Sequence, residues 1–108
     1  MSYDVSIYVE TGESEDASVC VFDRNQTSNV ARMWRAAGVD LSEWKDRPVG
    51  EVVEPLSEAV AAMKADPDKY RAMNPPNGWG SYETCLAFLE SILTACRVHD
   101  RGVLWVSH

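Results

Sequence analysis

Two apolar runs near the N-terminus predict a β-hairpin. From Tyr3 to Val9, every second residue is β-branched or aromatic, which is the period of a strand with one buried face. Residues 18–23 form a second run that is apolar on both faces, so we expect it at the centre of the sheet or beneath a helix. The polar stretch 11–16 is short enough to join the two strands as an antiparallel hairpin.

The next segment follows the helical period. Apolar residues recur at intervals of three and four between Val30 and Ala37, which places them on one helix face. Thr27 or Ser28 can cap the first amides of this helix. Gly38 follows it, where a residue in the left-handed region ends many helices.

Three further helices and one irregular segment are expected before residue 98. In the irregular part, Asp40 and Glu43 suggest one capped turn, and the segment 46–48 resembles another helix start. A helix is expected at about 54–65, where Pro55 requires either a kink or a short turn before the helix. A short helix follows, with Asp66 as cap and Pro67 in first position, and Ser81 caps a last helix with a broad apolar face.

The element order predicts the fold class. Residues 103–108 resemble a closing strand, so strands flank the helices in sequence. We therefore expect an α+β fold in which the N-terminal hairpin and the C-terminal strand form a small, mainly antiparallel, three-stranded sheet. Three to four helices would pack on one face of it. The 108 residues show no linker or internal repeat, and one domain over 1–108 is expected.

Composition and charge narrow the functional classes. The chain is 45% apolar and 25% charged, as in ordinary globular domains, and its net charge of −7 disfavours general nucleic-acid binding. No apolar run is long enough to span a membrane, and the N-terminus lacks the features of a signal peptide. The three cysteines are then expected to be reduced thiols of a cytoplasmic protein, serving as small core residues: Cys20, Cys85 and Cys96.

Two segments rich in asparagine are the candidate ligand site. The segment 74–82, Asn-Pro-Pro-Asn-Gly-Trp-Gly-Ser-Tyr, leads into a helix start, whose amides can meet an anion, and its aromatic rings can stack on a ligand. The segment 24–29 also enters a helix, and Arg24 can bind a carboxylate or phosphate. A rigid connector and simple capping are the structural alternatives. If the two segments meet, one pocket would be lined by Arg24, Asn25, Asn29, Asn74, Asn77, Trp79 and Tyr82.

A protein-interaction role is the alternative. Trp44 and Trp79 lie in irregular segments and are expected to be exposed, whereas Trp34 is expected in the core and Trp105 in either environment. Exposed tryptophans and the acidic loop 10–16 would suit a basic partner, for instance a host protein bound by an inhibitor.

Catalysis is unsupported by the sequence rather than excluded. His99 and His108 lack the spacing of a metal site, and no nucleophile, histidine and acid are arranged as a recognisable triad. No cofactor or metal ligand set is predicted. An enzyme using His99 or a cysteine remains a third hypothesis. The ligand, the partner and the oligomeric state do not follow from the sequence.

Two motifs carry a resemblance to a known group. The patterns Asn25-x-Thr-x-Asn-Val-x-x-Met-Trp34 and Asn74-Pro-Pro-Asn-Gly-Trp-Gly-x-Tyr82 resemble small, uncharacterised, single-domain proteins of bacteria and their phages, including actinobacterial ones. The resemblance runs from Tyr3 to the closing strand. It implies a free-standing cytoplasmic domain, encoded by a bacterium or by a phage. It implies no activity, cofactor or catalytic residue.

Overall fold

A four-stranded antiparallel sheet forms one layer of the molecule. The computed structural model describes residues 2–10 and 17–108. Its strands are β1 (Ser2–Glu10), β2 (Ser18–Thr27), β3 (Arg47–Pro48) and β4 (Val103–Ser107), in the order β2-β1-β4-β3. The hairpin and the closing strand are thus confirmed, but the expected count of three strands was one short.

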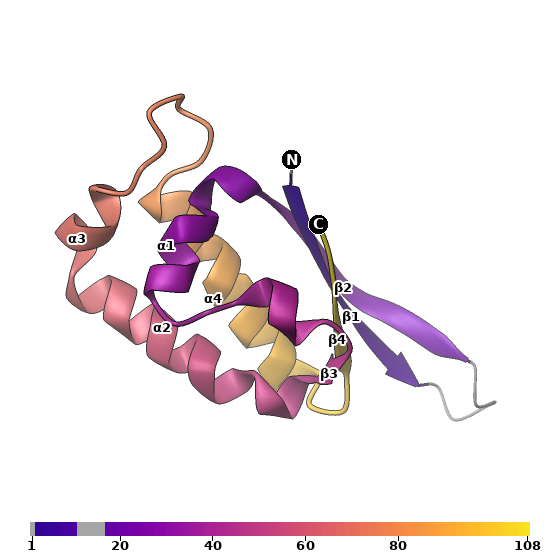
Figure 1. Ribbon diagram of the computed structural model, residues 1–108. Coiled ribbons are helices and arrows are strands. Elements are labelled where there is room, and N and C mark those ends of the chain that lie inside the picture. The colour runs from indigo at the N-terminus through magenta and orange to yellow at the C-terminus, as the bar shows by residue number, and fades with distance from the viewer. Residues whose placement is uncertain (1, 11–16) are drawn as a thin grey trace.

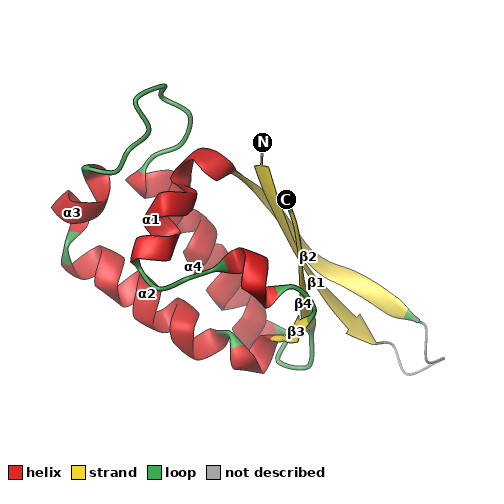
Figure 2. Cartoon of the chain, viewed as in Figure 1, coloured by secondary structure: helices red, strands yellow, loops and turns green. Residues whose placement is uncertain are grey.

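The helical layer lies on one face of this sheet, as expected for an α+β fold (Figures 1 and 2). It consists of α1 (Ala31–Ala36), α2 (Val53–Ala65), α3 (Pro67–Arg71) and α4 (Tyr82–Val98). In the described part of the chain, one turn of 3-10 helix, η1 (Ser28–Val30), leads from β2 into α1. Two more lie between α1 and α2: η2 (Leu41–Trp44) and η3 (Val49–Glu51). No helix in the described ranges has the length and apolar character needed to cross a bilayer.

The fourth strand replaces a helix start expected at 46–48. Asp46 adopts a φ of 63°, which turns the chain, and its N–H donates to the Leu104 carbonyl at 2.8 Å. Val49 then donates to the Gly102 carbonyl at 3.0 Å. Pro48 is tolerated because β3 is an edge strand, where a missing N–H breaks no interior pairing.

β2 lies at the other edge, not at the centre of the sheet. β1 pairs with β4 only from Asp4 to Tyr8, so the far end of the hairpin extends past the helices (Figure 1). Val19 and Cys20 are therefore exposed, which corrects the expectation that Cys20 is a core residue. The register shifts by one residue opposite Ile7 and Tyr8, which leaves Val21 as the extra residue of a bulge.

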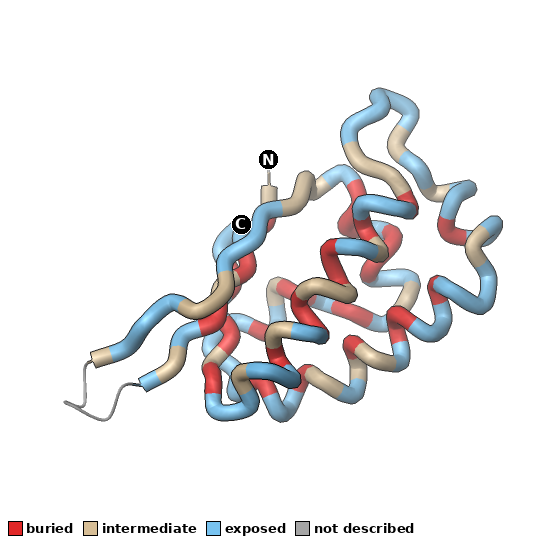
Figure 3. Tube along the Cα trace, turned by 180° about the vertical axis from the view of Figure 1, so that it is seen from behind, coloured by how far each residue is buried: buried red, intermediate tan, exposed pale blue. Residues whose placement is uncertain are grey.

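The core lies between the sheet and the helices (Figure 3). Trp34 is fully buried, as expected, and its ring meets Tyr3 edge-on with centroids 4.9 Å apart. Trp44, expected at the surface, is only 9% exposed because η2 packs against β4. Cys85 and Cys96 are buried on α4 and unbonded.

Most of the expected helix ends are confirmed. The Thr27 hydroxyl accepts from the Asn29 amide, the Asp66 carboxylate from Lys69, and Ser81 forms a capping box with Thr84. Gly38 has a φ of 99°. The helix near Pro55 begins after the short turn η3, with the proline in its first turn. Asp40 is the exception, because its carboxylate accepts from the Ser42 hydroxyl instead of capping η2.

Candidate functional site

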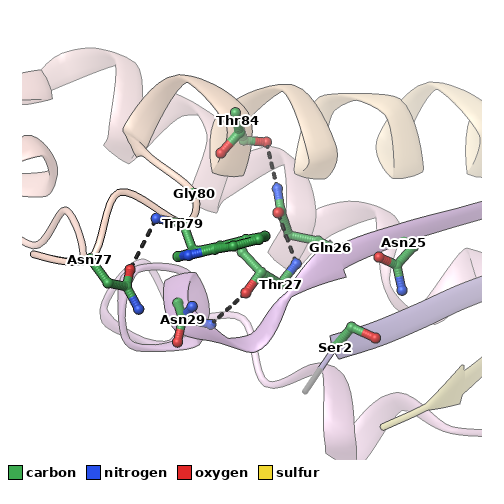
Figure 4. Close-up of a pocket in the computed structure, with 9 residues that line it drawn as sticks. All are labelled: Ser2, Asn25, Gln26, Thr27, Asn29, Asn77, Trp79, Gly80 and Thr84. Carbon is green, nitrogen blue, oxygen red and sulfur yellow. Dashed lines mark hydrogen bonds between the residues drawn. The ribbon is translucent and has the colours of Figure 1, made fainter.

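A groove lies where the end of β2 and η1 face the loop that leads into α4. Its volume is about 690 Å³. Four of its lining residues are among those named from the sequence, and they come from both asparagine-rich segments. The lining consists of Ser2, Asn25, Gln26, Thr27, Asn29, Asn77, Trp79, Gly80 and Thr84 (Figure 4). We refer to it as the Trp79 groove.

Trp79 is the most exposed of the large apolar side chains in the described part of the chain. Its relative exposure is 70%, so the indole contributes little to the core. The side chain of Asn77 accepts a hydrogen bond from the Trp79 amide at 2.9 Å, and Gly78 between them adopts a φ of 77°. This local turn directs the indole into the groove, toward Gln26 and Thr27 (Figure 4).

Gly80 holds the loop close to η1. A Cβ atom at this position would lie 2.8 Å from the Thr27 Cγ2 and 2.8 Å from the Val30 Cγ1. Its φ of 92° also belongs to the left-handed region that favours glycine. The glycine therefore permits the approach that brings Trp79 beside β2.

Gln26 fixes the opposite wall. Its Nε2 donates to the Thr84 carbonyl at 3.0 Å, and its Oε1 accepts from the Thr27 amide at 2.9 Å. The glutamine thus ties the end of β2 to the first turn of α4. Neither Gln26 nor Thr84 was predicted from the sequence as a site residue, although Gln26 stands within the asparagine-rich segment 24–29.

Several polar groups of the groove remain available to a ligand. The Asn29 side chain makes no hydrogen bond within the described part of the chain, and Asn77 uses only its oxygen, for the Trp79 turn. Asn25 donates to the Asp4 carboxylate at 2.8 Å, which leaves its own oxygen as an acceptor. These amides offer both donors and acceptors around the indole.

Three residues named from the sequence do not line the groove. Arg24 is exposed on β2, and the part of β2 that lines the groove begins at the next residue, Asn25. Tyr82 is buried, and its hydroxyl donates to the Met63 carbonyl at 2.9 Å. Asn74 accepts from the Tyr82 amide at 2.8 Å, so these two residues anchor the base of the loop.

A second, smaller groove adjoins the first. It has a volume of about 400 Å³ and shares Asn29 and Asn77 with the Trp79 groove. Asn74 lies in its wall, together with Arg32. The lining of the Trp79 groove contains no ionisable side chain, so Arg32 is the only cation in the combined lining of the two grooves.

The thiols on α4 are poorly suited to nucleophilic chemistry. Burial raises the pKa of Cys85 to about 12 and that of Cys96 to about 11, which keeps both protonated at neutral pH. His99 lies at the end of α4, away from both grooves. Within residues 2–10 and 17–108, no three His, Cys, Asp or Glu side chains are grouped as metal ligands would be.

Comparison of the chain with protein-family models, with curated proteins and with solved structures gave no match. The geometry and chemistry of the Trp79 groove are therefore the basis for proposing a function.

Proposed function

We propose that this chain is a binding protein that captures a small polar ligand in the Trp79 groove. The observation that carries the proposal is an indole that is 70% exposed and held in a fixed turn beside unused amide groups. An indole face stacks well on a sugar ring or a nucleobase, and side-chain amides recognise hydroxyl groups and base edges. A cytoplasmic location and a bacterial or phage origin belong to the same proposal.

The uncharged lining favours a ligand whose buried part is neutral. Asn, Gln, Thr and Ser provide hydrogen bonds without the charge that would attract a phosphate strongly. A phosphorylated ligand would have to extend its anionic group into the adjoining groove, toward Arg32. We therefore expect neutral sugars or nucleosides to bind at least as well as their phosphates.

A thermal melt tests this proposal. Neutral sugars and nucleosides are compared with their phosphorylated counterparts as matched pairs. Binding to the folded state adds about 2.7 kcal/mol at a hundredfold excess over Kd, which raises the Tm of a domain of this size by several degrees or more. We expect one class of neutral compound, either sugars or nucleosides, to raise the Tm. A shift only with the phosphates, or none at all, would contradict the proposal.

A protein-interaction role through Trp44 and Trp79 has less support. Trp44 is buried, so the two indoles do not form a shared surface. Glu13, Glu15 and Asp16, which were expected to attract a basic partner, lie outside the described residues.

A further inference from the structure

The sheet face opposite the helices carries an apolar row across all four strands. The register places Tyr8 between Cys20 of β2 and Val103 of β4, and Val103 opposite Pro48 of β3. Side chains directly opposite one another in a sheet point to the same face. Tyr8 and Cys20 are exposed, so this row faces solvent. We call this side of the sheet the outer face.

The neighbouring row carries a carboxylate and an indole on the two sides of Ser6. Ser6 lies opposite Asp23 on one side and Trp105 on the other, and its hydroxyl donates to the Asp23 carboxylate at 3.3 Å. Trp105 is 40% exposed, and the Lys45 Nζ lies 4.5 Å from the centre of its ring. The Trp105 ring therefore already accepts one cation of the chain by a cation–π contact.

No salt bridge with a described residue neutralises the carboxylates of the outer face. Alternation along β1 places Asp4 and Glu10 on the same face as Tyr8, and Asp23 joins them from β2. None of the three forms a salt bridge among the described residues. Asp4 and Asp23 each accept a hydrogen bond from a neutral side chain, which leaves their charge unneutralised.

We infer that the outer face docks an arginine-rich segment of a partner protein. A guanidinium group stacks on aromatic rings and pairs with carboxylates. The outer face carries both kinds of group around Ser6, with Asp23 and Trp105 opposite it on the two neighbouring strands and Tyr8 two residues along β1. A second copy of the chain would bring carboxylates against carboxylates if the two outer faces met. The negative face also repels nucleic acid. Tyr8, Asp23 and Trp105 do not line the Trp79 groove, so the inference does not depend on the proposed ligand.

An NMR titration with a blocked hexa-arginine peptide tests this inference. At low salt, we expect amide shift changes concentrated at Asp4, Ser6, Tyr8 and Trp105, with hexa-lysine binding more weakly because ammonium groups do not stack as planar groups do. The double variant Asp4→Asn/Asp23→Asn should weaken hexa-arginine binding by roughly tenfold, as expected for two lost ion pairs. Trp105→Leu should reduce the preference for arginine over lysine.

The matched control makes the same change of charge elsewhere. Glu58→Gln/Asp68→Asn removes two exposed carboxylates from α2 and α3, and should leave binding within about twofold of the parent protein. Equal weakening by both double variants would overturn the inference, since it would reveal attraction by net charge alone. Shift changes spread over the helical layer would also overturn it. Amide spectra of each variant alone confirm that it is folded.

Discussion

At the scale of single residues, the Trp79 groove depends on two glycines with different tasks. Gly78 and Gly80 both have positive φ, but a Cβ atom at Gly78 meets nothing within 4 Å, whereas one at Gly80 meets η1. Gly78→Ala should cost about 1–2 kcal/mol of stability from backbone strain alone. Gly80→Ala should cost roughly 1–3 kcal/mol more, because the side chains of Thr27 and Val30 must move. Urea unfolding of both variants measures the difference, and equal losses would show that the loop does not press on η1.

The cysteines offer a second test at this scale. Cys20 is exposed, whereas Cys85 and Cys96 are buried and their pKa values are raised to about 12 and about 11. Iodoacetamide reacts with the thiolate, so we expect mass spectrometry to find a single alkylated cysteine, Cys20, in the folded protein at neutral pH. All three should react in denaturant. Rapid alkylation of Cys85 in the native state would contradict its burial on α4.

At the scale of elements, the first turn of α4 links stability to pH. A hydrogen bond from the backbone amide of Glu83 and its pairing with Arg71 at 3.1 Å lower the pKa of this carboxyl. A carboxyl with a lowered folded pKa stabilises the fold above its unfolded pKa, and this stabilisation is lost as pH falls through the folded value. Glu83→Gln should therefore be less stable than the parent at pH 7. The difference should shrink as pH falls below the ordinary glutamate value of about 4.3 and then through the lowered folded pKa.

Unfolding curves at several pH values test this expectation. The control is Glu58→Gln on α2, an exposed glutamate that forms no salt bridge among the described residues. It should show no comparable dependence on pH. A Glu83→Gln variant whose deficit persisted unchanged to pH 3 would indicate lost helix packing instead of a lost charge.

At the scale of the whole molecule, the sheet should not be uniformly stable. β1 is paired on both sides from Asp4 to Tyr8, but beyond that point it pairs only with β2. Hydrogen exchange should therefore be slowest at Val5 and Ile7 and much faster at Val9 and Val19. Equal protection along the full hairpin would contradict this gradient.

What could be predicted from the sequence was mainly local. Caps at Asp66 and Ser81 and the turn at Gly38 were correct because each depends on a few neighbouring residues. β3 was missed because it depends on pairing with β4, more than fifty residues away in sequence. The burial of Trp44 has the same origin, since β4 is what covers η2.

The candidate site was recoverable only in part for the same reason. The segments 24–29 and 74–82 were predicted as the site from their asparagines, and Trp79 was expected to be exposed. The role of Gln26 follows from its contact with Thr84, 58 residues away, which composition and spacing do not encode. The Arg24 side chain points to the opposite face of β2 from Asn25, which is a matter of strand register. The Tyr82 side chain is buried and bonded to the Met63 carbonyl, which is a matter of core packing.

The most direct test of the central proposal compares two tryptophan variants in the ligand melt. Trp79→Ala removes the indole of the groove, and Trp105→Ala removes an exposed indole of the outer face. Without ligand, Trp79→Ala should change stability by no more than about 0.5 kcal/mol. With neutral sugars or nucleosides, the rise in Tm should be lost in Trp79→Ala and kept in Trp105→Ala. A Trp79→Ala protein that keeps the full shift would contradict the assignment of the groove.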